Sequence, residues 1–447
     1  MKTKFRDHQP DDRMLLPPSF ADLLPKEHEV FFVRETVLKA DLSQIYGSYT
    51  ATKGQPPYQP SMMVALLLYA YIRGVRSARK IERMLWEDIP MRYLSGNQQP
   101  DFWTIAYFRK RHLDALAEFF AQTVVAAQRA QLVKLDDLAV DGTKLRANAS
   151  KHRAMSYGRL EQEEKRLQEV IAEDLKAAVA EDEAEARTEH PKDPPDKGGK
   201  AKELAIAEER LETVREAKQE LERRAVEREE KRQAAVRARG ATPRHSATDV
   251  KPKAKDQINF TDAESRVMKD GQGTFIQGYN AQAAVDAETQ IIVAADLTNV
   301  APDVGHLPDL IDQVRRNIGR LPKRVLADAG YYSEANVKDI ERQRCEPLIP
   351  PERISHMQWR TTKAPKGRIP KNLSTKQRMI RKLHTKRGKE LYKRRETSVE
   401  PIFGQIKWNR NLRQISFRGL ANAKASWLFE CAVHNLIKMY KAGIAWA

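Results

Sequence analysis

Cysteine is scarce in this chain, which contains only Cys345 and Cys431 among its 447 residues. Two cysteines are too few for a disulfide scaffold or a zinc–cysteine cluster, and their scarcity fits a reducing compartment. We expect both side chains to act as small apolar residues of the core.

Long apolar runs are also missing. The longest, Met62 to Ile72, is far shorter than the roughly 20 residues that span a bilayer, and it predicts a buried helix instead. The N-terminal stretch MKTKFRDHQPDD has no apolar signal region. We therefore expect a cytoplasmic, nucleoid-associated protein without a membrane partner. No glycine-rich loop that would cradle phosphates occurs, so ATP is not expected.

Acidic residues are outnumbered. The chain has 79 Lys and Arg against 61 Asp and Glu, a formal charge of +18 and a pI near 9.7. This excess favours a polyanionic partner, and nucleic acid before anionic membrane. The basic run, residues 353–395, holds sixteen Lys or Arg and the single acid Glu390, which no packed core tolerates. Trp359 and Tyr392 within it favour nucleic acid over a disordered arm. Its candidate DNA contacts are Arg378, Arg381 and Lys382.

The first part of the chain, from about Phe20 to Gln131, has apolar residues at helical spacing. Helix starts are predicted at Pro60-Ser61, at Ser77 and at Pro100-Asp101, the last opening one helix through FWTIAYFRKRHLDALAEFF. Two short helices and a turn before a basic helix suggest a helix-turn-helix-like DNA module, with plain helical packing as the alternative. Its candidate phosphate contacts are Arg109 and Arg111.

Strands are predicted around a charged central segment. Leu138 to Val140 is an apolar run that ends in Asp141-Gly142-Thr143. Further on, FIQGYNAQAAVD and QIIVAADLTNV predict a hairpin, and a short apolar strand ends in Asp328. Helices are predicted for His306 to Ile318 and after the cap Ser333, and a last strand at 347–350. This order indicates a mixed sheet flanked by helices.

The central segment, Gly158 to about Val236, is dense in Glu, Lys, Arg and Ala, and prolines and glycines interrupt it at 190–200. In its second arm, apolar residues from Leu204 to Ala225 recur at steps of three and four and form an apolar stripe, which we call the seam. Lys218 is the one polar residue in this stripe. This predicts an antiparallel helical hairpin inserted into another domain. A solvated, partly disordered charge run is the alternative. Arg237 to Gln257 is typical of a basic linker.

Three carboxylates stand out by their positions. Asp141 ends a buried strand, where a carboxylate is costly unless a cation or hydrogen-bond donors meet it, and Gly142 leaves space beside it for a metal or a phosphate. A turn aspartate is the alternative, because Asp-Gly is a strong turn signal. Asp328 and Glu400 occupy comparable element ends. Two or three carboxylates suffice for magnesium, and two ions roughly 3.5–4 Å apart serve phosphoryl transfer.

Four stretches carry a specific resemblance: DGTKLRANASKH, SRVMKDGQGTFIQGYNAQAAVD, VLADAGYYSEANV and YKRRETSVEPIFGQIK. They resemble DDE-type bacterial insertion-sequence transposases over nearly the whole chain. The resemblance implies a ribonuclease H-like domain and a catalytic, metal-binding triad, Asp141, Asp328 and Glu400, with two Mg²⁺ ions for which Mn²⁺ substitutes. It also implies DNA partners, namely terminal inverted repeats and target DNA, and a homo-oligomer that is at least a dimer on DNA.

The family signature is Tyr, two residues, Arg, three residues, Glu, six residues, Lys. Tyr392, Glu400 and Lys407 fit, whereas four residues separate Arg395 from Glu400. The resemblance implies that Tyr392, Arg395 and Lys407 hold DNA near the cut. Glu400 and Lys407 are two helical turns apart, hence on one face, and Pro401 predicts a helix start or kink with Glu400 at its edge. The expected apolar face comprises Val399, Phe403 and Ile406.

These observations predict an α/β chain in three parts. They are a helical DNA-binding domain (1–131), a ribonuclease H-like catalytic domain (132–157 and 258–447), and a charged helical insertion with its linker (158–257). The expected function is metal-dependent cleavage at insertion-sequence ends and strand transfer into target DNA. The alternatives are a ribonuclease H-like nuclease without strand transfer and a non-catalytic DNA-binding regulator. Structural roles are expected for Asp136, Asp137, Asp286, Asp296, His306, Asn148, Ser150 and His152.

Overall fold

The computed structural model describes residues 19–49, 56–185, 197–238, 240–243, 245–352, 363–370, 372–444 and 446. Trp359 and the rest of the 353–362 stretch of the basic run lie outside the described residues. Among the described helices, none combines the length and the apolar character that crossing a bilayer requires.

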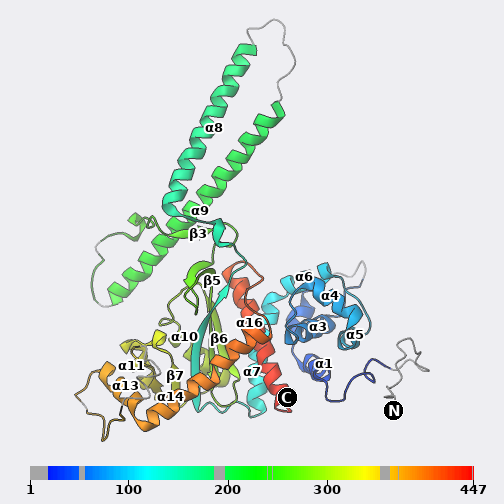
Figure 1. Cartoon of the computed structure of the whole chain (residues 1–447), viewed down its shortest axis with the longest axis vertical. Coiled ribbons are helices and arrows are strands. Elements are labelled where there is room, and N and C mark those ends of the chain that lie inside the picture. The colour runs from blue at the N-terminus through cyan, green and yellow to red at the C-terminus, as the bar shows by residue number, and fades with distance from the viewer. Residues whose placement is uncertain are drawn as a thin grey trace, which may run out of the picture.

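The N-terminal part is helical, as predicted (Figure 1). Pro60 opens the buried helix α3, and Ser77 precedes α4 without a side-chain capping bond. The single helix expected after Asp101 is wrong, because the chain breaks at His112 into α6 and α7. His112 leaves helical geometry (φ −108°, ψ 22°), and its buried ring packs against Phe108. The helices are α1 (Glu29–Lys39), α2 (Ser43–Gly47), α3 (Pro60–Ile72), α4 (Ala78–Glu87), α5 (Ile89–Ser95), α6 (Phe102–Arg111) and α7 (Leu113–Arg129).

A six-stranded mixed sheet forms the centre. Its strands are β1 (Asp137–Arg146), β4 (Arg266–Lys269), β5 (Phe275–Asp286), β6 (Ile292–Thr298), β7 (Arg324–Ala327) and β8 (Glu346–Leu348). The order is β4-β5-β1-β7-β8, and β6 pairs with β5. β5 is antiparallel to β1, β4 and β6, whereas β7 is parallel to β1 and β8. The predicted β5–β6 hairpin and the ribonuclease H-like mixed sheet are confirmed.

The first strand is longer than predicted. β1 does not end at Asp141 but continues to Arg146, because its antiparallel pairing with β5 extends from Leu138↔Asp286 to Arg146↔Gly278. The parallel pairing with β7 stops earlier, at Val140↔Ala327. Asp141 therefore lies within a strand, at the point where one of its two neighbouring strands ends.

Helices cover the sheet. The helices α10 (Leu307–Ile318) and α16 (Leu420–Lys441) pack on β6, and α7 packs on both of them. α3 contacts α16 and so joins the N-terminal helices to the sheet. Around β7 and β8 lie α11 (Glu334–Arg342), α13 (Thr375–His384) and α14 (Lys386–Ser398) (Figure 1). Ser333 caps α11 as predicted, and both cysteines are buried and unbridged.

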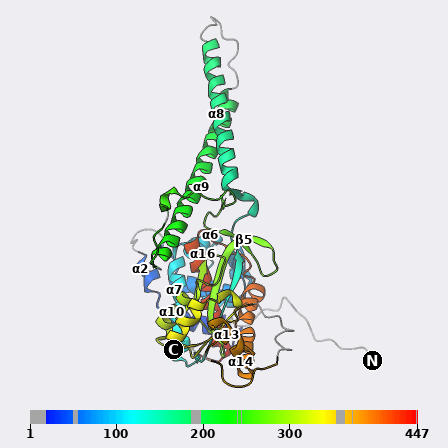
Figure 2. The same ribbon diagram turned by 90° about the vertical axis from the view of Figure 1, so that its left-hand side faces the viewer.

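The predicted helical-hairpin insertion is confirmed. α8 (Tyr157–Glu185) and α9 (Lys197–Ala238) run antiparallel and project from the body (Figures 1 and 2). Lys218, the polar exception in the seam, pairs with Glu164 of α8 at 2.9 Å. At the base, β2 (Ala154–Ser156) pairs with β3 (Gln257–Asn259), flanked by η1 (Lys151–Arg153) and η2 (Ala247–Asp249). Side chains buried in the seam include Leu160, Leu167, Leu211, Val214 and Leu221.

Candidate active site

The sheet brings Asp141 and Asp328 together. Val140 and Ala327 are the last paired residues of the parallel strands β1 and β7, and each is followed by one of the two aspartates. Neighbouring parallel strands keep their register, so the two carboxylates emerge side by side at the same edge. Asp328 begins the short helix η3 (Ala329–Tyr331), where its Oδ1 accepts the N–H of Gly330 at 2.8 Å.

Glu400 reaches the same place from the C-terminal helices. α14 ends at Ser398, and α15 (Glu400–Gly404) begins with Glu400 and Pro401 in its first turn, as predicted from the proline. α14 packs on β1 and β7 and carries Arg395 in its last turn. The Arg395 guanidinium donates to Asp141 Oδ2 at 2.9 Å and to Glu400 Oε1 at 3.2 Å. One guanidinium thus bridges the first and third carboxylates.

The charge balance around Asp141 is unusual. Burial raises the pKa of Asp141 to about 6, although the Arg395 guanidinium acts in the opposite direction. The nearby carboxylates of Asp328 and Glu400 push the pKa further upward, and a hydrogen bond from the Gly142 N–H lowers it. A single guanidinium therefore leaves this group of carboxylates short of positive charge.

The residues of the triad fit a divalent cation chemically, because carboxylate oxygens are the hard ligands that such ions prefer. In the described part of the chain, however, no three acidic, histidine or cysteine side chains stand close enough to hold an ion as they lie. Arg395 occupies the space between Asp141 and Glu400. It is 8% exposed, and its buried Nε has no hydrogen-bond partner among the described residues. The guanidinium supplies positive charge to these two carboxylates.

Two other signature residues flank this arrangement. The ring of Tyr392 lies beside Arg395, with the guanidinium 5.7 Å from the ring centroid, and burial raises the pKa of its hydroxyl to about 12. Lys407 donates to the carbonyl oxygen of Lys144 in β1 at 3.0 Å.

The expectation that Glu400 and Lys407 share one helix face assumed a regular α-helix, and this assumption is wrong. Lys407 lies in a π-helical segment, η4 (Gln405–Asn409), whose wider turn changes the spacing. It therefore contacts β1 three residues beyond Asp141. The expected apolar face is confirmed by the buried side chains of Val399, Phe403 and Ile406.

The other candidate DNA contacts differ in exposure and in their partners. Arg378 is exposed, Arg111 is exposed but donates to the Ser48 carbonyl at 2.6 Å, and Arg381, which donates to the Lys366 carbonyl at 2.8 Å, is half-buried. Arg109 and Lys382 have internal partners. Arg109 donates to Tyr71 and to the carbonyl of Arg76, while Lys382 pairs with Glu346 at 3.1 Å. These two side chains are thus already engaged in holding the fold.

A fourth carboxylate, Asp303 in the loop before α10, was not predicted. Its Oδ1 accepts hydrogen bonds from Lys144 (3.1 Å), Asn280 (2.7 Å) and Gln282 (2.8 Å). The space expected to stay open beside Gly142 is occupied by Gln282 and Asp303. A Cβ at Gly142 would lie 3.1 Å from Asp303 Oδ1, and one at Gly330 would lie 3.3 Å from its Oδ2. In the sequence, only Gly142 and Gly330, which follow Asp141 and Asp328 closely, indicated that another group lies near these aspartates.

Most of the remaining acids and polar residues for which structural roles are expected have partners in the structure. Asp136 pairs with Lys323, and Asp296 with Lys424. Asp286 accepts the Leu135 N–H at 2.6 Å. Further contacts join Asp137 to Arg324 and Arg394, Asn148 to the Ser416 carbonyl, and Ser150 to the His152 N–H. His306 directly precedes α10, but its side chain makes no capping hydrogen bond.

Two protein families match the chain. A family described as a transposase DDE domain matches residues 241–436, and a transposase domain, DUF772, matches residues 18–111. The first range contains Asp328, Arg395 and Glu400, whereas Asp141 lies between the two ranges. Neither curated proteins nor solved structures gave a significant match.

Proposed function

Because this chain is a DDE-type insertion-sequence transposase, and hence a nucleic-acid-processing enzyme, we propose that it cleaves DNA at the ends of an insertion sequence and transfers the freed 3′ ends into target DNA. The observation that carries this proposal is the register of β1 and β7. It sets Asp141 beside Asp328, within reach of the guanidinium that also holds Glu400.

Transposases of this family use divalent metal ions, and we propose two Mg²⁺ ions, for which Mn²⁺ substitutes, in this site. Asp141 and Asp328 would bind both ions and Glu400 one. When bound, the ions would stabilise negative charge on the attacking and leaving oxygens of the phosphate. The burial of Asp141 supports this role, because a desolvated carboxylate gains most from an added cation.

Arg395 has a second role in this proposal. Metal cations bound to the carboxylates would replace the guanidinium as their source of positive charge. Arg395 would then be free to leave its position between Asp141 and Glu400. A guanidinium is well suited to two parallel hydrogen bonds with a phosphate, so the released side chain would hold the DNA backbone near the cut. Tyr392 and Lys407 would contact the same DNA, together with the exposed Arg111 and Arg378 and the half-buried Arg381. The target DNA and the terminal repeats would be brought together by a homo-oligomer.

The triad variants test the reaction. Asp141→Asn, Asp328→Asn and Glu400→Gln each remove one ligand charge while nearly conserving volume. Cleavage of labelled terminal-repeat DNA in Mg²⁺ or Mn²⁺ should fall by several orders of magnitude in all three, because both ions are needed at the reacting phosphate. Folding and DNA affinity, followed by thermal melts and gel shifts, should persist.

Matched controls are Asp136→Asn and Asp296→Asn, which remove an equal charge from carboxylates that pair with the lysines Lys323 and Lys424. Both should keep most of the activity. Full cleavage by Glu400→Gln, or inactivity of Asp296→Asn, would contradict the assignment. Cleavage without strand-transfer products would favour a nuclease, and the absence of any metal-dependent nicking would favour a DNA-binding regulator.

A further inference from the structure

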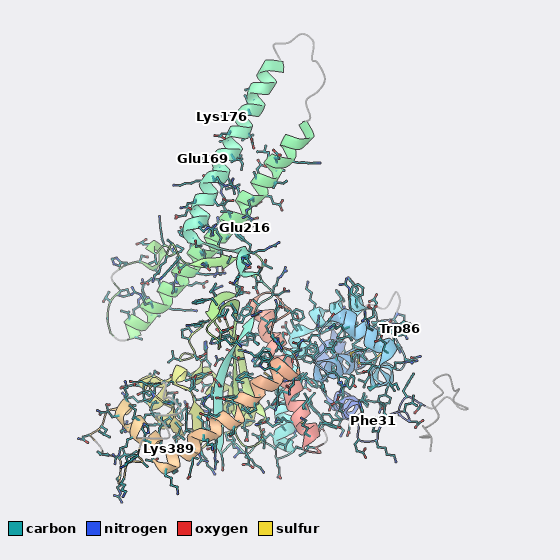
Figure 3. All side chains as sticks on the ribbon, viewed as in Figure 1. Phe31, Trp86, Glu169, Lys176, Glu216 and Lys389 are labelled. Atoms are coloured by element: carbon teal, nitrogen blue, oxygen red, sulfur yellow. The ribbon has the colours of Figure 1, made fainter. Side chains whose placement is uncertain are left out.

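Four large aromatic side chains are exposed on two of the N-terminal helices, α4 and α6. We call Trp86 of α4 and Phe102, Trp103 and Tyr107 of α6 the aromatic face. Their exposed fractions are 61%, 38%, 64% and 49%. The core side of α6 is supplied by Ile105 and Phe108, so the aromatic face is not needed for packing. Figure 3 shows Trp86 at the outer edge of this helical part, pointing away from the sheet.

The aromatic rings are ordered. Trp103 and Tyr107, one turn apart on α6, stack with their centroids 5.2 Å apart and their planes 3° from parallel. The guanidinium of Arg79 on α4 lies 4.7 Å from the centroid of Phe102, which connects the two helices. Arg79, Arg83 and Trp86 follow at steps of four and three and thus share one side of α4. The exposed side chains of α4 and α6 therefore form one continuous surface.

The charge of this surface is positive. α6 contains no acid after its cap Asp101, and Lys110 and Arg111 at its end are exposed, whereas Arg109 points inward to Tyr71. Lys110 is three residues beyond Tyr107, on the same side of the helix. On α4, the three cations Arg79, Lys80 and Arg83 outnumber the two acids Glu82 and Glu87. Lysine is depleted at protein–protein interfaces, whereas aromatic rings interleaved with cations suit nucleic acid.

The kind of nucleic acid follows from the ring geometry. In a duplex, the faces of the bases are covered by their neighbours, and only base edges reach the grooves. An exposed aromatic ring can stack only on a base whose face is free. We propose that the aromatic face binds unpaired bases of DNA, with Trp103 and Tyr107 as the stacking platform and Arg79, Arg83 and Lys110 as phosphate contacts. The proposal takes its DNA partner from the proposed function but does not depend on the triad.

The test compares two probes, a single-stranded oligothymidine and a duplex of the same length, by fluorescence anisotropy with the full chain in EDTA. Trp103→Ala combined with Tyr107→Ala should weaken binding of the oligothymidine about ten-fold or more, since stacking contributes about 1–3 kcal/mol per base. Binding of the duplex should change less than two-fold. The slope of log K against log salt should stay the same, because the protein keeps all of its charges. The control Phe275→Ala, an exposed ring on β5, should bind both probes like the parent.

The cations give an independent measurement. Arg79→Gln combined with Arg83→Gln should flatten the salt slope for the oligothymidine by about 0.7 for each phosphate that the variant no longer neutralises. Unchanged affinity of the aromatic variant, or equal losses for both probes, would overturn the proposal. An aromatic variant that keeps its DNA affinity but changes the sedimentation of the protein would instead make this surface a contact between protein chains. Loss of cleavage activity alone bears on the triad and not on this surface.

Discussion

At the scale of single residues, Arg395 is the most informative side chain. Its side chain is almost fully buried and donates hydrogen bonds to both Asp141 and Glu400. Burial nevertheless raises the pKa of Asp141 to about 6. Neutralisation of the carboxylates is therefore incomplete. Arg395 and a metal ion would compete for the same oxygens, so removing the guanidinium should favour the ion.

Arg395→Gln should bind Mn²⁺ more tightly in the absence of DNA, by about ten-fold, which corresponds to about 1.4 kcal/mol. The metal-free variant should also melt at a lower temperature, because the largely buried carboxylate of Asp141 loses its partner. Calorimetric titration and thermal melts measure both effects. Arg394→Gln is the control, since Arg394 pairs with Asp137 instead of the triad. Equal or weaker Mn²⁺ binding by Arg395→Gln would show that the guanidinium does not compete with the ion.

At the scale of elements, the helical hairpin differs in charge from the rest of the molecule. α8 carries ten acidic and four basic residues, and α9 carries ten acidic and twelve basic residues. The hairpin is thus net negative in a chain of charge +18. Such an arm is poorly suited to phosphates, and we infer that it serves contacts between proteins, consistent with its projection from the body in Figure 2.

Leu211→Ser combined with Leu221→Ser tests the seam. Both leucines are buried between α8 and α9, and truncating a buried leucine to alanine costs about 2–5 kcal/mol. Circular dichroism should show reduced helicity, and sedimentation should show altered assembly. Metal binding should persist because the triad lies on other elements. Ile206→Ser, an exposed position on α9, should change nothing. Full helicity and normal transposition of the double variant would refute this role.

At the scale of the whole molecule, positive charge gathers around the edge of the sheet at which Asp141 and Asp328 lie. α14 packs on β1 and β7 and carries Arg395, and its neighbour α13 carries Arg378 and Arg381. The acidic hairpin lies at the other end of the molecule (Figure 1). DNA attracted by the net charge would therefore be directed toward the triad and away from the arm.

The salt dependence of duplex binding tests this arrangement. Arg378→Gln combined with Arg381→Gln should flatten the slope of log K against log salt by about 0.9 for each phosphate left without its arginine, and weaken specific and nonspecific binding alike. Lys382→Gln should have a smaller effect, because Lys382 is half-buried and pairs with Glu346. A slope that only Lys382→Gln alters would mean that α13 meets DNA through a different face.

The sequence alone determined most of the helices and strands. The cap at Ser333, the break at Pro401 and the seam from Leu204 to Ala225 depend on residues close together in the chain, so local patterns predicted them. The proposed triad rests on a family resemblance, because spacing cannot show that Asp141 and Asp328, far apart in the sequence, lie next to one another.

The tertiary structure alone decided how these parts meet, because the deciding contacts join residues far apart in sequence. β1 runs past Asp141 since β5 continues to pair with it, and Lys407 contacts β1 since a π-helical turn redirects it. Arg395 lies between two carboxylates through the packing of α14 on the sheet. Asp303 is held near these carboxylates by hydrogen bonds from Lys144 of β1 and from Asn280 and Gln282 of β5. No local sequence pattern specifies how these two strands are arranged.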